Sequence, residues 1–207
     1  MLKQLYKVYS FFAIRIGMRL DNLITRIIFT IHGVSGKSFT SLGVPLLSVY
    51  GSGKCQFGSN LVMVNSAKHS TLGKNNRCKF VVSANANLTI GNKVGMSNVT
   101  IVATKSIVIG NNIMIGGGVT IVDSDFHSLN PLHWHTNADE KNMISSPVHI
   151  KDNVFIGMDS IILKGVTIGS NVIIAAGSVV FKDIPDNQIW GGNPANFIRD
   201  NKINSLV

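Results

Sequence analysis

A chain of 207 residues is long enough to form one well-packed domain. Hydrophobic residues make up 45% of it and charged residues only 14%, which excludes a chain that is disordered by composition. Its two cysteines exclude a disulfide scaffold and suit buried thiols in a reducing, cytoplasmic compartment. The formal net charge of +9 suits an anionic partner, but no RNA-binding signature accompanies it, so we expect no nucleic-acid partner.

Residues 1–36 form the first predicted segment, a basic amphipathic helix. Apolar residues recur through it at spacings of three and four, whereas Arg15, Arg19 and Arg26 fall on the opposite side. The longest uncharged run, residues 27–36, is well short of the roughly 20 residues that cross a membrane, and no signal-peptide cleavage site follows. Such a helix either makes a peripheral contact with the inner face of a membrane, or packs its apolar side on the protein and caps an exposed end.

The main signal in residues 37–200 is a period of six. In the clearest run, aliphatic residues stand at intervals of six, at Ile150, Ile156, Ile162, Ile168, Ile174 and Val180. An earlier run comprises Leu72, Cys78, Ala84, Ile90 and Met96, and a third, after a one-residue slip near 103–105, comprises Ile109, Ile115 and Ile121. A short strand and a turn fill six residues, so three such units close a triangular coil. The sequence therefore predicts an all-β solenoid, closed by the N-terminal helix and by a short C-terminal cap that ends in the tail 201–207.

The period fails between Ile121 and Val148. Residues 124–146 hold three of the six histidines, one of the two tryptophans and the only glutamate of the chain. A polar excursion from a regular scaffold is where function tends to lie, so we expect the site to include this loop.

Three strings carry a resemblance to a known family. They are IVIGNNIMIGGGVTIVDSDFHSLN (107–130), PVHIKDN (147–153) and VFIGMDSIILKGVTIGSNVIIAAGSVVFKDIPDNQIWGGNPANFIR (154–199). On these strings the chain resembles the hexapeptide-repeat acyltransferases, and it is most similar to the O-acetyltransferases of bacterial surface-polysaccharide synthesis. The resemblance implies a left-handed parallel β-helix, a homotrimer with active sites between neighbouring subunits, and acetyl-CoA as co-substrate without a metal.

The resemblance assigns the catalytic base to His127, which follows a predicted strand at the start of the excursion. An imidazole suits this role because a sugar hydroxyl does not ionise unaided near neutral pH. The base needs a partner on its other ring nitrogen, and the candidates are Asp125, Asp123 and Glu140. Turn-capping roles for the two aspartates and a solvated charge for Glu140 are the alternatives.

Three residues are candidates for binding the acceptor. Asn98 lies near the position of a functional asparagine in related enzymes, and a corner role is the alternative. Trp134 could stack on a sugar ring, and Glu140 lies in the same excursion. Loop packing is an equally good explanation for the tryptophan.

The resemblance places the coenzyme A groove along the coils of residues 154–199. The residues assigned to it are Phe155, Gly157, Ala175, Ala176, Lys182 and Arg199. The small residues would let the pantetheine arm approach the backbone, and the two cations would meet the phosphates; tight corners and solvated charges are the alternatives. Many relatives have Trp at the place of Phe155 and a basic residue at that of Asn196, so the details of coenzyme A binding differ here.

The sequence thus predicts an enzyme that moves an acetyl group from acetyl-CoA to a sugar hydroxyl in O-antigen, capsule or exopolysaccharide synthesis. The expected location is the cytoplasm, with peripheral contact at the inner membrane. An N-acyltransferase acting on an amino-sugar nucleotide and a non-catalytic β-helix scaffold are the alternatives. A γ-type carbonic anhydrase is disfavoured, because its H-x4-H zinc spacing is absent after His127.

Overall fold

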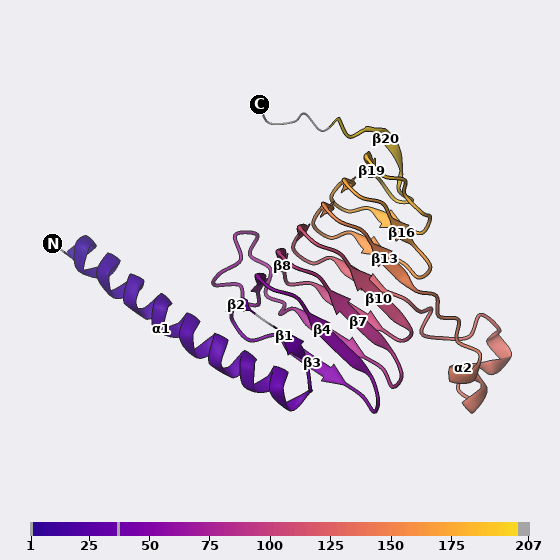
Figure 1. The fold of residues 1–207 in the computed structure, drawn as a ribbon, viewed down its shortest axis with the longest axis horizontal. Coiled ribbons are helices and arrows are strands. Elements are labelled where there is room, and N and C mark those ends of the chain that lie inside the picture. The colour runs from indigo at the N-terminus through magenta and orange to yellow at the C-terminus, as the bar shows by residue number, and fades with distance from the viewer. Residues whose placement is uncertain (1, 37, 203–207) are drawn as a thin grey trace.

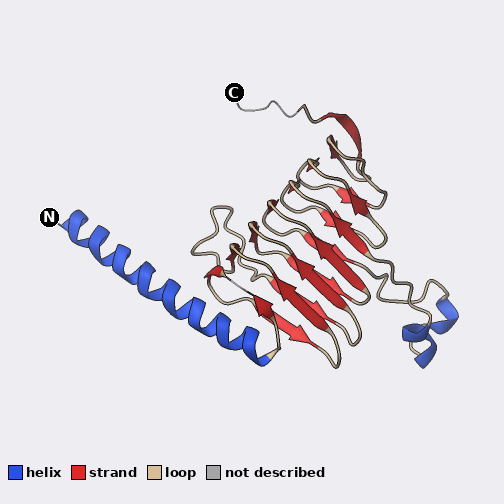
Figure 2. Ribbon diagram, in the orientation of Figure 1, coloured by secondary structure: helices blue, strands red, loops and turns tan. Residues whose placement is uncertain are grey.

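The computed structural model describes residues 2–36 and 38–202, and these form a helix, a triangular solenoid and a C-terminal hairpin (Figures 1 and 2). Helix α1 spans Leu2–Ile31. Sheet A has the order β1 (Ser35–Gly36), β4 (Lys54–Phe57), β7 (Asn87–Ile90), β10 (Ser106–Ile109), β13 (Val148–Ile150) and β16 (Thr167–Ile168). Sheet B has the order β2 (Phe39–Leu42), β5 (Leu61–Val64), β8 (Val94–Ser97), β11 (Ile113–Ile115), β14 (Phe155–Ile156), β17 (Ile173–Ile174), β19 (Gln188–Gly191) and β20 (Asn196–Asp200). Sheet C holds β3 (Leu46–Val49), β6 (Lys79–Val82), β9 (Thr100–Ala103), β12 (Thr120–Val122), β15 (Ile161–Ile162) and β18 (Val179–Val180).

The chain visits sheets A, B and C in turn, and each strand pairs in parallel with the strand one coil later. Ile150 pairs with Ile168, eighteen residues on, which is the coil length expected from the six-residue period. Ile90 pairs with Ile109, nineteen residues on, so the predicted one-residue slip lies in that coil. The fold is the predicted left-handed parallel β-helix.

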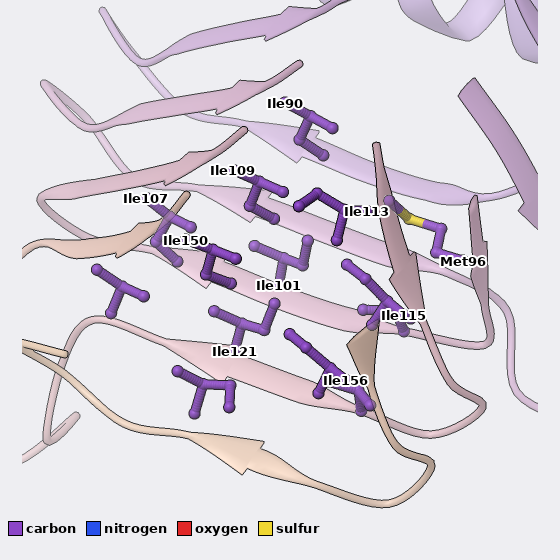
Figure 3. Close-up of a cluster of buried hydrophobic side chains, with 14 of the residues drawn as sticks. Ile90, Met96, Ile101, Ile107, Ile109, Ile113, Ile115, Ile121, Ile150 and Ile156 are labelled. Carbon is purple, nitrogen blue, oxygen red and sulfur yellow. The ribbon is translucent and has the colours of Figure 1, made fainter. Parts of the chain in front are cut away.

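The aliphatic residues of the hexads fill the interior of the prism (Figure 3). Ile156, Ile162, Ile168 and Ile174 are fully buried, and the small Ser160 and Ser178 are buried beside them. Burying one such side chain contributes roughly 1.5–3 kcal/mol. The two cysteines also lie in this core, where burial raises the pKa of the Cys55 thiol to about 12 and that of Cys78 to about 11.

Asparagines shape the corners between sheets A and B. Asn112, Asn153, Asn171 and Asn187 all have positive φ angles, between 56° and 60°. Their side chains form a ladder along the corner, with amide bonds of 2.7, 3.0 and 2.9 Å between successive coils. Asparagine tolerates the left-handed region better than other residues with a Cβ, which explains its high count in this chain.

The earliest predicted hexad run is wrong in two positions. Leu72 and Ala84 are exposed, and the interior residues of that coil are Phe80 and Val82. The chain leaves the solenoid after β5 and returns at β6, so residues 65–78 form a second excursion. Phe57 pairs with Ile90, thirty-three residues later, and this long separation reflects the insertion.

Helix α1 caps the first coil with one face of its C-terminal half. Phe29 and Thr25 are buried, and the Phe29 ring packs on Phe39 at 5.1 Å and on Phe57 at 5.2 Å between centroids. Asn22 exchanges hydrogen bonds with the backbone of Ser41, at 3.0 and 3.2 Å. Of the two alternatives, the one in which the helix caps an exposed end is borne out in its position, but the predicted packing face is wrong, because a mixed face docks and the apolar stripe stays exposed.

The C-terminal cap is an antiparallel hairpin at the end of sheet B. Strand β20 pairs with β19, and the rings of Trp190 and Phe197 meet edge to face at 6.4 Å. Most of the predicted tail 201–207 lies outside the described residues. None of the helices in the described part of the chain is long and apolar enough to span a membrane.

Candidate active site

The excursion 124–146 leaves and re-enters the solenoid through a narrow neck. Ser124 and Ser145 form an antiparallel bridge, and the amide of Ser146 donates to the carbonyl of Asp123 at 2.9 Å. Between Ser124 and Ser145 the chain forms a 3-10 turn, η1 (Pro131–His133), and a short helix, α2 (Asn137–Lys141). The loop projects from the corner between sheets C and A, as Figure 2 shows.

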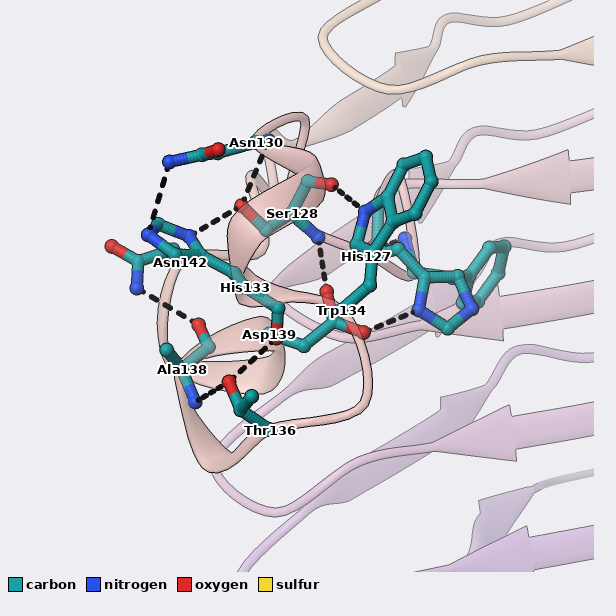
Figure 4. Close-up of polar contacts among 11 residues, drawn as sticks. His127, Ser128, Asn130, His133, Trp134, Thr136, Ala138, Asp139 and Asn142 are labelled. Atoms are coloured by element: carbon teal, nitrogen blue, oxygen red, sulfur yellow. Dashed lines mark hydrogen bonds and ion pairs between the residues drawn. The ribbon is translucent and has the colours of Figure 1, made fainter.

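Ser128 is the buried centre of this loop, and it is not among the predicted site residues. Its amide donates to Asp139 Oδ1 at 2.6 Å, and its carbonyl accepts a bond of 2.7 Å from the indole nitrogen of Trp134. Its hydroxyl lies 2.8 Å from His133 Nδ1. Figure 4 shows these contacts converging on one residue, which fixes the loop conformation around His127.

His127 is held by a carboxylate from α2. Its Nδ1 lies 2.8 Å from Asp139 Oδ2, while 73% of the histidine side chain remains exposed (Figure 4). A carboxylate accepts only, so Nδ1 carries the proton and Nε2 is left as an acceptor. This is the orientation that a general base needs: one ring nitrogen anchored and the other free to receive a proton.

Asp139 is ionised under ordinary conditions. The hydrogen bond from His127 and the one from the Ser128 amide lower the pKa of its carboxyl below the usual value. A negative charge beside the imidazole favours its protonated form at the moment a proton is accepted. His127, Trp134, His135 and Asp139 together line a pocket of about 320 Å³, and the Trp134 ring is half exposed there.

The carboxylates predicted to orient His127 lie elsewhere in the structure. Asp123 is fully buried and closes the turn of residues 104–106, accepting from three backbone amides at 2.7–2.8 Å. Asp125 pairs with Lys164 of the next coil at 2.8 Å. Glu140 lies on the exposed side of α2. The carboxylate that contacts His127 is therefore Asp139, and not Asp123, Asp125 or Glu140, because the helical turn of α2 directs residue 139 to the histidine.

Asn98 lies at a different corner of the prism, between sheets B and C. It is buried with a positive φ of 52°, its amide nitrogen donates to the carbonyl of Asn76, and its Oδ1 has no hydrogen-bond partner. Within one chain the fold does not bring Asn98 to His127, because His127 lies in the loop that connects sheet C to sheet A.

The predicted coenzyme A residues fall into two groups. Phe155 is exposed on sheet B, and Gly157 follows it at the corner between sheets B and C. A Cβ on Gly157 would meet the backbone of Ala175 and Ala176 in the next coil, so these small residues allow two coils to stack closely. Ala176 itself is exposed beside them.

The two cations assigned to the phosphates lie elsewhere. Lys182 follows β18 at the corner between sheets C and A, where its Nζ sits 5.1 Å from the Phe181 ring centroid. Arg199 is exposed on β20. One chain therefore gathers Phe155, Gly157 and the alanines but not these two side chains.

The second excursion, residues 65–78, borders the same corner as Gly157. Lys74 forms an ion pair with Asp159 at 2.5 Å, and Leu72 lies over Gly117. Leu72, Met96, Met114, Gly117 and Phe155 are among the residues lining a groove of about 300 Å³ on sheet B. This apolar groove beside Phe155 suits an extended, partly apolar arm, so the residues present fit a coenzyme A thioester. Among the described residues no three His, Cys, Asp or Glu side chains gather as a metal site.

Known proteins resemble part of this chain. Residues 147–182 match the family model of the bacterial transferase hexapeptide (six repeats). Galactoside O-acetyltransferase of Escherichia coli K12 is 40% identical over 119 residues, which are 57% of this chain and 56% of that protein. The chain spans about half the length of the curated relatives it matches.

Solved structures give the same class. A galactoside acetyltransferase in complex with coenzyme A superposes with a TM-score of 0.51 and 34% identity over 60% of each chain. A maltose O-acetyltransferase from Clostridium difficile 630 gives a TM-score of 0.50 and 35% identity, over 56% of this chain and 60% of that one. The protein is thus similar to hexapeptide-repeat acetyltransferases, and the named relatives are sugar acetyltransferases.

Proposed function

We propose that this protein is an acetyl-CoA-dependent O-acetyltransferase that acts on a saccharide hydroxyl. The observation that carries the proposal is the pairing of His127 with Asp139 beside an exposed tryptophan in a pocket of about 320 Å³. Similarity to galactoside and maltose O-acetyltransferases supports the same reaction. An indole face in the pocket suits a sugar ring, which presents an apolar face and hydroxyl edges.

In the proposed mechanism, acetyl-CoA supplies an activated acetyl group. His127 Nε2 takes the proton of the acceptor hydroxyl as the oxygen attacks, and Asp139 stabilises the imidazolium that results. The protonated imidazole then returns the proton to the departing thiolate. Trp134 orients the saccharide, and Ser128 keeps the histidine, the tryptophan and the aspartate in register.

We also propose that the active unit is a homotrimer with sites between subunits. Within one chain His127 leaves the corner between sheets C and A, whereas Asn98, Gly157 and Ala176 lie at the corner between sheets B and C. A cyclic assembly can place one corner of each prism against the other corner of its neighbour, which completes the site. In that assembly Asn98 and Glu140 bind the acceptor. Lys182 or Arg199, from either of the two subunits, binds the phosphates of coenzyme A.

The finer assignment is the modification of a surface polysaccharide or its precursor, such as O-antigen, capsule or exopolysaccharide, in the cytoplasm. It rests on the resemblance drawn from the sequence of residues 107–130 and 154–199, whereas the relatives named above are galactoside and maltose O-acetyltransferases. Buried, reduced cysteines suit the same compartment.

An acceptor panel tests the proposal. Thiol release from acetyl-CoA is measured with galactosides, maltose, polysaccharide repeat units and an amino-sugar nucleotide. We expect turnover on a hydroxyl-bearing saccharide, with the product ester cleaved by mild base. Turnover confined to the amine acceptor would replace the proposal by an N-acyltransferase, and a failure to bind coenzyme A would leave a non-catalytic scaffold.

A further inference from the structure

The exposed side of α1 carries a continuous apolar stripe that nothing in the described chain covers. Ile16, Leu20, Leu23, Ile24, Ile27 and Ile31 are each between 44% and 74% exposed. They recur at helical spacing, so they form one row along the helix. The helix end is fixed by Thr25 and Phe29 on the other side, which prevents the stripe from rotating into the protein.

A row of arginines lies along the border between this stripe and the docking face, and not on the side opposite the stripe as the sequence predicts. Arg15, Arg19 and Arg26 follow one another at intervals of four and seven residues and line a groove of about 530 Å³ with Asn22 and Thr40. Arg26 packs over the Phe39 ring at 5.4 Å, which holds its guanidinium at the junction of helix and solenoid. The helix therefore presents cations along one border of an apolar surface.

The charge of the whole chain is divided along the solenoid axis. Residues 1–122 contain thirteen Lys and Arg and a single acid, Asp21, whereas residues 123–207 contain six cations and nine acids. Because the coils stack in sequence order along one axis (Figure 1), the end that carries α1 is strongly positive and the far end is mildly negative.

We propose that α1 binds an anionic membrane surface, with the stripe at the acyl boundary and Arg15, Arg19 and Arg26 on lipid phosphates. An interfacial helix combines an apolar face with basic residues in this way. The charge distribution favours lipid over a second copy of the chain, because residues 38–122 offer no carboxylate to the arginines. The single acid of α1, Asp21, accepts the Gly43 amide at 2.8 Å, and every other acid of a second copy lies beyond residue 122.

Vesicle binding of the full chain tests this proposal without acetyl-CoA or a saccharide, so its outcome is independent of the transferase. Wild type is centrifuged with vesicles rich in phosphatidylglycerol and with vesicles of phosphatidylcholine alone. We expect binding to the anionic vesicles that weakens as salt rises. Arg15→Gln/Arg19→Gln/Arg26→Gln is expected to lose roughly 100-fold in partition, since each cation near the surface is worth roughly fivefold.

The control for charge is Lys54→Gln/Lys93→Gln/Lys105→Gln, which removes three exposed cations from the solenoid and should bind nearly as wild type. The charge-keeping Arg15→Lys/Arg19→Lys/Arg26→Lys should also bind, which separates loss of charge from loss of fold. For the stripe, Leu20→Gln/Ile24→Gln/Ile27→Gln should abolish binding. The control Leu129→Gln/Leu132→Gln/Ile144→Gln removes apolar groups that are at least as exposed from the excursion and should not abolish it.

Circular dichroism confirms that each variant keeps its helix. Equal binding to both kinds of vesicle, or a loss shared by the helix variants and their controls, would overturn the proposal. So would a wild type that ignores vesicles but self-associates through the stripe, detected by sedimentation as a mass that falls in the Leu20→Gln/Ile24→Gln/Ile27→Gln variant.

Discussion

Asp139 Oδ2 lies 2.8 Å from His127 Nδ1, and its other oxygen accepts the amide of the residue that follows the histidine. One carboxylate thereby fixes both the ring and the backbone at the point where the chain leaves the solenoid. The eleven residues between them form η1 and the start of α2, so a single loop supplies both side chains of the pair.

Asp139→Asn should lower kcat by roughly 100-fold, because the imidazolium formed during proton transfer loses its anionic partner. The KM for acetyl-CoA should stay near the wild-type value, since both Asp139 oxygens are bound within the loop, to His127 and to the Ser128 amide. Steady-state kinetics check this, with Glu140→Gln as the control on the neighbouring, exposed position. Equal losses in the two variants would show that a general loosening of α2, and not the carboxylate, is responsible.

Acid should open the loop only at a pH below the range in which carboxylates usually become protonated. The pKa of Asp139 is lowered by His127 and by the Ser128 amide, so its contribution to stability is complete above the unfolded value of about 4. It is lost as the pH falls through the lower folded value. Trp134 fluorescence in a Trp190→Phe background reports the transition, because the Trp134 indole is bound to Ser128. Asp139→Asn should lack it, and a wild-type transition above pH 5 would contradict this account.

Gly157→Ala should destabilise the solenoid by about 1–3 kcal/mol, as expected for overpacking. A Cβ at this corner would press on the backbone of Ala175 and Ala176, which cannot yield as a side-chain tip can. Urea unfolding measures the effect. Gly95→Ala is the matched control, because a Cβ there meets nothing within 4 Å and should change the stability by less than about 0.5 kcal/mol. Equal losses of stability in Gly157→Ala and Gly95→Ala would contradict the view that close stacking of the coils requires glycine at position 157.

If active sites form between subunits, a mixture of two variants that are each inactive should regain activity. His127→Ala damages the corner between sheets C and A, and Ala176→Trp blocks the corner between sheets B and C at an exposed position. After joint unfolding and refolding, random assembly gives an intact pair of corners at about a quarter of the sites. Specific activity near that fraction of wild type supports the trimer, and activity no higher than that of either variant alone would place the whole site within one chain.

The hexads made the solenoid and its core predictable, because an inward aliphatic every sixth residue leaves few other folds. The loop 65–78 was missed since Leu72 and Cys78 continue the count by chance while the chain makes an excursion. Asp139 was missed for a similar reason: no periodic signal shows which residue of a one-turn helix faces back to a histidine twelve positions earlier. The docking face of α1 was also missed, because the polar Asn22 and Thr25 lie in it.

The most direct test of the proposed reaction is saccharide-dependent thiol release by His127→Ala, with coenzyme A binding measured on the same samples. The control is His149→Ala, which removes an exposed histidine from β13 in sheet A. We predict that His127→Ala binds coenzyme A as wild type does and loses at least roughly 100-fold in kcat, while His149→Ala keeps its activity. Full turnover in His127→Ala would contradict the assignment of the base and with it the mechanism.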